Sequence, residues 1–296
     1  MHDGGPVLAG LTLPTVSAFD PPVAGEGSID PMGVAAISDR LADILVPGLR
    51  ARMSRIRFVT AMAIGAASCE PIADEISADE TSTPSIGFEW LLIEAFVRRL
   101  NVESFPPAIP GSQKCRAVIK RNQRLSAQSY LKGPSVFGFN GVYKPFAVDS
   151  GVVDADLQPA ALCAAVLRSW EREQRFAGFA DNIPGTEGGR LRGQIRDEVR
   201  AALRSGRCNT NPGGWLFGKL AASLRPDGAG RGERAALRAL IEKSPHETRA
   251  ELGRHLVSLS AELRACTEIR CVTRRRGAVR GGACSSIRRG SRGGPG

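Results

Sequence analysis

Apolar residues return at helical spacing along most of this chain. Leu191, Ile195, Val199 and Leu203 recur every four residues, which places them on one face of an amphipathic helix. Helical patterning is also found over residues 112–125, 142–150, 159–176, 214–224, 233–243 and 245–263. The alternation of apolar and polar residues that is typical of a β-strand is not sustained anywhere. The sequence therefore predicts a mainly α, multi-helical fold.

Three further helices are predicted in the N-terminal part. Asp30 followed by a proline is typical of a helix start, and this helix is expected to end before Pro47. The second helix is predicted over about 54–67, with Ser54 as its N-cap. The third, 86–100, is apolar on nearly all sides, so we expect it to be buried.

Composition divides the chain into four parts. Residues 1–29 are rich in glycine and proline and are expected to form an irregular arm. Helical patterning then fills two regions, 30–150 and 151–263. From 264 to 296, nine arginines face a single acid, so this tail carries +8 of the total charge of +10 and leaves +2 for the rest. The net positive charge therefore describes the tail and is not evidence of a DNA-binding face on the folded body.

Two interpretations of residues 264–296 remain open. In the first, they are a disordered Arg/Gly-rich tail that contacts phosphate backbones without sequence preference. In the second, they are a translation of the wrong reading frame, because 34 arginines against 6 lysines indicate a GC-rich gene, whose shifted codons yield arginine, glycine and cysteine. The native protein would then be longer, and this chain would lack its C-terminal part.

The compartment is predicted from what the sequence lacks. The chain shows no signal peptide and no apolar run near the roughly 18 residues of a membrane span. Its seven cysteines are scattered and odd in number, which does not match a disulfide framework. We therefore expect a cytoplasmic protein with reduced thiols and no membrane partner.

Residues that carry chemistry are sparse. Only three histidines are present, and none adjoins the glycine-flanked serine or cysteine of a nucleophilic triad. No P-loop motif occurs. Asp154 and Asp156 form a carboxylate pair that suits a divalent ion or, in the plainer interpretation, a helix N-cap with a solvated neighbour. The sequence predicts no catalytic residue, no metal site and no cofactor, and it favours a protein that is not an enzyme.

Four arginines gather before the second predicted helix: Arg50, Arg52, Arg55 and Arg57. A helix N-terminus is already positive, so cations placed there need anions. Backbone N–H groups at the same end would add donors, which favours a phosphate site. In the alternative interpretation, Asp39, Asp43 and the acidic stretch 74–80 supply the anions in structural ion pairs.

A second candidate interface lies within residues 130–176. Two helices joined by a short glycine-containing turn would form a helix-turn-helix, winged in one version. Its phosphate contacts would be Lys132, Lys144, Arg168 and Arg172. The alternative is an ordinary helical pair whose aromatic residues belong to the core.

One stretch carries a resemblance. In the run from Asp39 to Phe58, a short helix is followed by Leu45-Val-Pro-Gly48 and then by arginines before an aromatic residue. Over residues 30–58 the chain resembles uncharacterised bacterial proteins from antiphage-defence and mobile-element neighbourhoods. The resemblance implies a cytosolic bacterial protein that works in a multi-protein system, and it implies no reaction.

We therefore predict a non-enzymatic, nucleic-acid-associated or scaffolding component of a bacterial defence or mobile-element system. Two alternatives stay open. One is a truncated enzyme, metal-dependent and nuclease-like, whose catalytic part is missing from this chain or which uses Asp154 and Asp156. The other is a protein-interaction module that binds neither nucleic acid nor metal.

Overall fold

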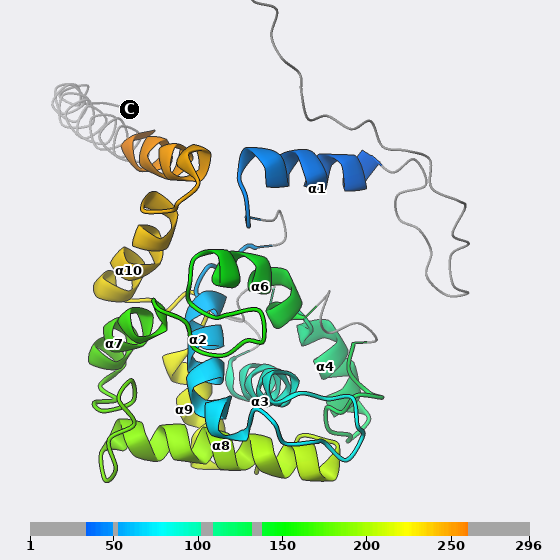
Figure 1. Cartoon of the computed structure of the whole chain (residues 1–296). Helices are drawn as coiled ribbons and strands as arrows, with labels where there is room; N and C mark the ends of the chain where they lie inside the picture. The colour runs from blue at the N-terminus through cyan, green and yellow to red at the C-terminus, as the bar shows by residue number, and fades with distance from the viewer. Residues whose placement is uncertain (1–33, 50–52, 102–108, 132–137, 260–296) are drawn as a thin grey trace, which may run out of the picture. The chain divides into compact units, whose positions relative to one another are not determined.

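The computed structural model describes residues 34–49, 53–101, 109–131 and 138–259. These residues form helices and two isolated β-bridges, and no strand occurs among them, which confirms the mainly α prediction (Figure 1). The chain divides into two compact units, 1–41 and 42–296. The arm predicted at 1–29 and the tail predicted at 264–296 lie outside the described residues.

Helix α1 (Val34–Leu45) runs from the first unit into the second. The other elements belong to the second unit: α2 (Phe58–Cys69), η1 (Glu70–Ile72), α3 (Pro84–Arg99), α4 (Ser112–Lys120), α6 (Phe139–Asp149), α7 (Cys163–Gln174), α8 (Glu187–Ser205), α9 (Trp215–Ser223) and α10 (Arg231–Glu242). Residues 247–259 form a further helix. In the described part of the chain, no helix combines the length and the apolar character that crossing a bilayer requires.

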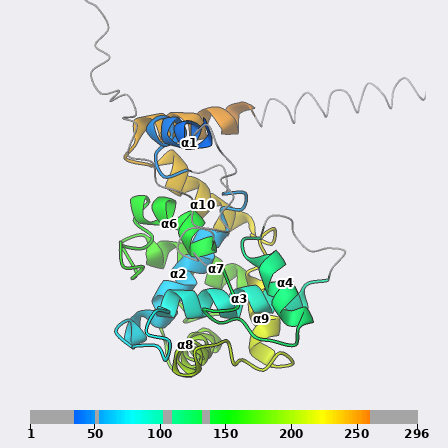
Figure 2. The same ribbon diagram turned by 90° about the vertical axis from the view of Figure 1, so that its right-hand side faces the viewer.

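Helices α2 and α3 form the centre of the second unit (Figures 1 and 2). Every residue of α2 is buried, and α3 is buried from Gly87 to Phe96. Helix α3 packs against α8 and α9, while α2 packs against α7 and α8. Helices from both sides of residue 150 thus share one hydrophobic core. The boundary predicted at residue 150 does not separate two cores.

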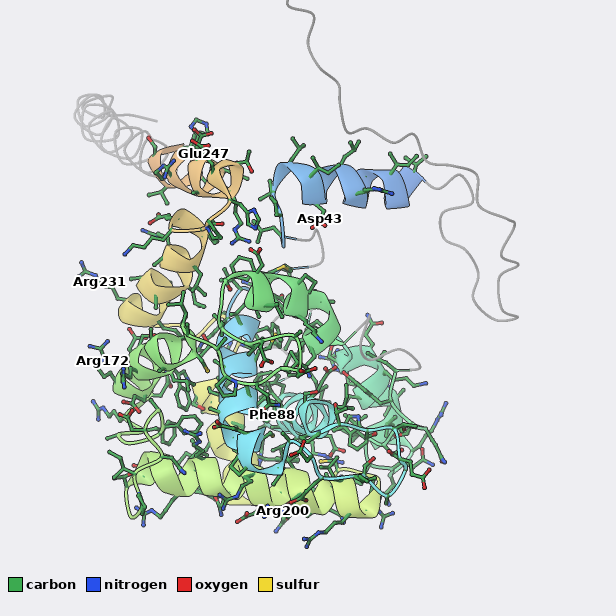
Figure 3. All side chains as sticks on the ribbon, in the orientation of Figure 1. Asp43, Phe88, Arg172, Arg200, Arg231 and Glu247 are labelled. Carbon is green, nitrogen blue, oxygen red and sulfur yellow. The ribbon has the colours of Figure 1, made fainter. Side chains whose placement is uncertain are left out.

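Aromatic rings join the central helices. The ring of Phe58 lies 5.5 Å from that of Phe139 and 5.2 Å from that of Tyr143, and it meets Phe96 edge-on at 6.3 Å. Figure 3 shows Phe88 in the interior, whereas arginines such as Arg172 and Arg200 project from outer helix faces. The aromatic residues of α6 therefore belong to the core, as the plainer interpretation of this segment expected.

Two helix ends differ from the sequence prediction. Helix α2 begins at Phe58 rather than at Ser54, and in the segment before it the backbone N–H of Arg55 donates to the Tyr143 hydroxyl at 2.9 Å. Helix α4 ends at Lys120 rather than near Leu125. The next turn places Asn122 in the left-handed region at φ 56°, which stops the helix.

Helices α6 and α7 do not have the short connection of a helix-turn-helix. Residues 150–162 separate them, and Val153 and Pro159 form an isolated antiparallel bridge within this loop. The turn of a helix-turn-helix has roughly three to four residues. Buried faces of both helices contribute to the core, so the pair is part of the helical body.

A buried carboxylate on α3 sets the start of α6. Glu89 accepts hydrogen bonds from the Tyr130 hydroxyl at 2.6 Å and from the backbone N–H groups of Phe139 and Asn140 at 3.2 Å each. It thereby satisfies donors that a helix N-terminus leaves free. Burial raises the pKa of Glu89 to about 7, although the hydrogen bonds from Tyr130, Asn140 and Phe139 partly oppose the shift.

This raised pKa predicts that stability falls as pH rises. The folded protein binds the Glu89 proton more tightly than the unfolded chain does, whose model value is 4.5, so the unfolding free energy decreases as pH rises from about 4.5 to about 7. The loss is on the order of 3 kcal/mol. In Glu89→Gln, which keeps an acceptor for Tyr130, this pH-dependent loss should disappear. Urea unfolding of both proteins from pH 4 to pH 8 measures it, and parallel stability curves would contradict it.

Candidate functional site

Arg57 lies inside the protein and forms a structural ion pair. Its Nε and Nη2 atoms donate to the two carboxylate oxygens of Glu233 at 2.9 and 2.8 Å, and both side chains are buried. Nη2 also donates to the Ser223 carbonyl at 2.9 Å, and Nη1 donates to that of Arg225. Every guanidinium nitrogen is thus engaged within the fold, which leaves Arg57 unable to contact phosphate. The anion is Glu233, not the acids that the sequence suggested.

Arg55 and Lys144, two further predicted contacts that the structure describes, line different cavities. Arg55 lines a cavity beside α10, whereas Lys144 lines a separate cavity of about 660 Å³ together with Trp90 and Tyr130. Arg50, Arg52 and Lys132 lie outside the described residues. The structure therefore does not bring Arg55 and Lys144 together.

Asp154, which was considered for a divalent ion, takes part in local hydrogen bonds, and two cysteine thiols of the core are buried. Asp154 Oδ1 accepts hydrogen bonds from the backbone N–H groups of Asp156 at 2.9 Å and Gln158 at 2.8 Å, so it caps its own loop. Among the described residues, no three histidine, cysteine or acidic side chains are grouped to hold a metal ion. Burial raises the pKa of the Cys69 and Cys163 thiols to about 12, which keeps them protonated and unreactive near neutral pH.

His246 contacts an ion pair between Asp149 and Arg249. Its Nε2 atom lies 2.6 Å from Asp149 Oδ1, and the buried guanidinium of Arg249 pairs with the other oxygen of the same carboxylate. Arg249 further donates to the Pro47 carbonyl at 2.8 Å and lies over the Phe146 ring. These contacts hold the helix 247–259 against α6 and the Pro47 turn.

A basic groove lies between α4 with its following loop and the end of α8. It encloses about 770 Å³. Its basic side chains, which define the name used below, are Lys114, Arg121, Arg124 and Arg207. Amide and hydroxyl side chains also line it: Asn122, Gln123, Gln128, Ser126, Ser129 and Ser205. The groove thus offers both positive charge and hydrogen-bond donors.

The charges of the basic groove are largely unbalanced. Lys114, Arg121 and Arg207 form no ion pair with any residue that the structure describes. The single acid in the lining, Asp79, accepts hydrogen bonds from the Ser77 hydroxyl and from the Ser82 N–H and hydroxyl, each at 2.7 Å. Burial opposes ionisation of Asp79, but these hydrogen bonds hold its pKa well below the usual range. One anion therefore faces three unpaired cations.

The core holds the floor of the basic groove in place. Glu94 of α3 is fully buried and accepts hydrogen bonds from Arg124 Nε at 2.9 Å and from the Leu125 N–H at 2.8 Å. Arg124 also donates to the Thr210 carbonyl at 2.7 Å. On the other side, the Cys208 N–H donates to the Leu125 carbonyl at 2.7 Å. The groove is therefore a preorganised feature of the fold.

Only one side of this groove has a signal in the sequence. The helix predicted at 112–125 is visibly basic, and it contains Lys114 and Arg121. Arg207 follows the end of α8 and forms an isolated bridge with Ser126, and no local pattern connects it with α4. Comparison with family models, with curated proteins and with solved structures gives no match to this chain.

Proposed function

We propose that this protein binds nucleic acid without catalysis, through contacts between the basic groove and the phosphate backbone. The observation that supports the proposal is the set of three unpaired cations, Lys114, Arg121 and Arg207, around a groove of about 770 Å³. Phosphate contacts supply most of the affinity of sequence-independent binding. A role in a bacterial defence or mobile-element system, and a cytoplasmic location, are parts of this proposal that rest on the sequence.

The chemistry of the groove favours a double-stranded ligand. None of the described residues that line it is aromatic. Proteins that bind single strands hold the bases by stacking them on aromatic rings. Amide and hydroxyl groups, in contrast, donate to phosphate oxygens and fix the position of a backbone. The side chains of Asn122, Gln123 and Gln128 are suited to that task, so we propose duplex DNA as the ligand.

The double variant Arg121→Ala, Arg207→Ala tests the proposal. Each lost phosphate contact reduces the slope of log K against log salt by about 0.9, so the double variant should lower it by about 1.8. Both side chains are exposed, so the thermal midpoint should stay unchanged. Fluorescence anisotropy with a labelled DNA duplex, titrated at several salt concentrations, gives the slopes.

Arg172→Ala is the matched control. Arg172 is exposed on α7, away from the groove lining, and belongs to the helix-turn-helix interpretation. It should leave affinity and slope unchanged. Absence of duplex binding by the parent protein, or equal slopes for the parent and the double variant, would overturn the proposal. Tighter binding of a single strand than of the duplex would reject duplex DNA as the ligand.

A further inference from the structure

The cavity that Arg55 lines has an apolar floor and lies on a different part of the second unit from the basic groove. It measures about 520 Å³ and is bounded by α10, by the helix 247–259, and by Leu49 together with residues 54–57. Its apolar side chains come from all three: Leu49, Ile56, Leu237, Ile241, Leu252 and Leu256. We call it the apolar groove. It shares no lining residue with the basic groove.

Two large side chains of the apolar groove remain exposed. Leu252 is 37% exposed and Leu256 is 57% exposed, one helical turn apart. By contrast, Leu237 on the facing helix is 2% exposed. The two helices approach closely at Gly253, where an added Cβ would lie 2.9 Å from Ile241 Cγ2. The leucines therefore flank a packed helix pair whose apolar surface is only half covered.

The rim of the apolar groove is positive. Arg55, Arg234 and Arg238 line it together with two acids, Asp227 and Glu242. The Asp227 charge is already matched, because Arg225 donates to its carboxylate at 2.7 Å. Three cations thus face one unmatched acid, and an occupant with negative flanks would be favoured.

We propose that the apolar groove docks an amphipathic helix of another protein, with an apolar stripe and acidic flanks. Such a helix inserts apolar residues at i, i+3, i+4 and i+7 into a groove of this kind. Leu252 and Leu256 would be covered by these anchors, and Arg234 and Arg238, one turn apart on α10, would pair with the acidic flank. This docking site is independent of nucleic-acid binding by the basic groove.

Two synthetic peptides test the proposal on the full chain. Both carry leucine at i, i+3, i+4 and i+7; one has glutamate at the flanking positions and the other has lysine. The glutamate peptide should bind saturably and at least about tenfold more tightly than the lysine peptide, as expected for complementary charge. Leu256→Asp should weaken its binding by about tenfold or more, since loss of a central anchor has an effect of this size.

Charge reversal gives the sharpest readout. The double variant Arg234→Glu, Arg238→Glu should bind the glutamate peptide more weakly and the lysine peptide more tightly than the parent protein does. Arg231→Glu, exposed on the first turn of α10 but outside the groove lining, is the matched control and should change neither (Figure 3). Equal binding of both peptides, no saturable binding, or an unchanged affinity in Leu256→Asp would overturn the proposal. A parent dimer that Leu256→Asp dissociates would assign the groove to a second copy of this chain and also overturn it.

Discussion

Replacing Arg57 with alanine should destabilise the protein by about 3–5 kcal/mol, because Glu233 would then be a buried charge without its partner. Urea unfolding followed by circular dichroism at neutral pH measures the loss. Arg55→Ala is the control, since Arg55 is only half-buried and lies two residues away. It should change the unfolding free energy by about 1 kcal/mol or less.

A double replacement tests whether an apolar pair of similar size can take the place of the buried ion pair. Arg57→Met combined with Glu233→Leu should recover most of the stability lost in the single variants, because an apolar pair of similar size avoids the cost of burying two charges. A single variant that loses less than about 1 kcal/mol would contradict the structural role of Arg57. A double variant whose loss of unfolding free energy equals the sum of the losses in Arg57→Met alone and Glu233→Leu alone would also contradict it.

Phe96→Ala should cost about 3–5 kcal/mol through lost burial and the cavity that remains. Phe96 is fully buried on α3 and meets the Phe58 ring edge-on. The matched control is Ile76→Ala, an apolar side chain that is 84% exposed. That change should have almost no effect on the urea midpoint. If Phe96→Ala unfolds within about 1 kcal/mol of the parent, α3 cannot be the central helix of the core.

Helices that are specified by their own apolar pattern could be predicted from the sequence. The predicted ranges 86–100, 214–224 and 233–243 match α3, α9 and α10 to within two residues at each end. In these helices the buried face recurs at helical spacing, and burial is the largest favourable contribution to folding. The same reasoning identified 86–100 as a buried helix.

Helix ends that depend on distant partners could not be predicted. Ser54 is a good N-cap by residue type, but α2 begins only at Phe58, and the segment before it contacts Tyr143, 88 residues away from Arg55. The start of α6 depends on Glu89, 50 residues earlier in the chain. Local propensity contains no information on such contacts.

The candidate site was predicted only in part for the same reason. The sequence showed that cations at the start of α2 need anions, which is correct for Arg57, but its partner Glu233 lies 176 residues away. The basic groove likewise combines a visibly basic helix with Arg207, which only the tertiary fold brings to it. Residue types indicated the kind of chemistry, and the packing of the core decided where it occurs.

The position of Glu94 has a consequence for genetics. This one carboxylate is buried in the core, holds Arg124 at the basic groove and accepts a hydrogen bond from the N–H of the adjacent, buried Leu125. Any ligand that binds only the folded groove stabilises the whole unit. By reciprocity, any substitution that destabilises the packing of α3 lowers the apparent affinity for the ligand. A random screen for loss of binding should therefore return substitutions in the middle of α3 as often as substitutions of the groove arginines. Growth at reduced temperature should rescue the first class and leave the second unchanged.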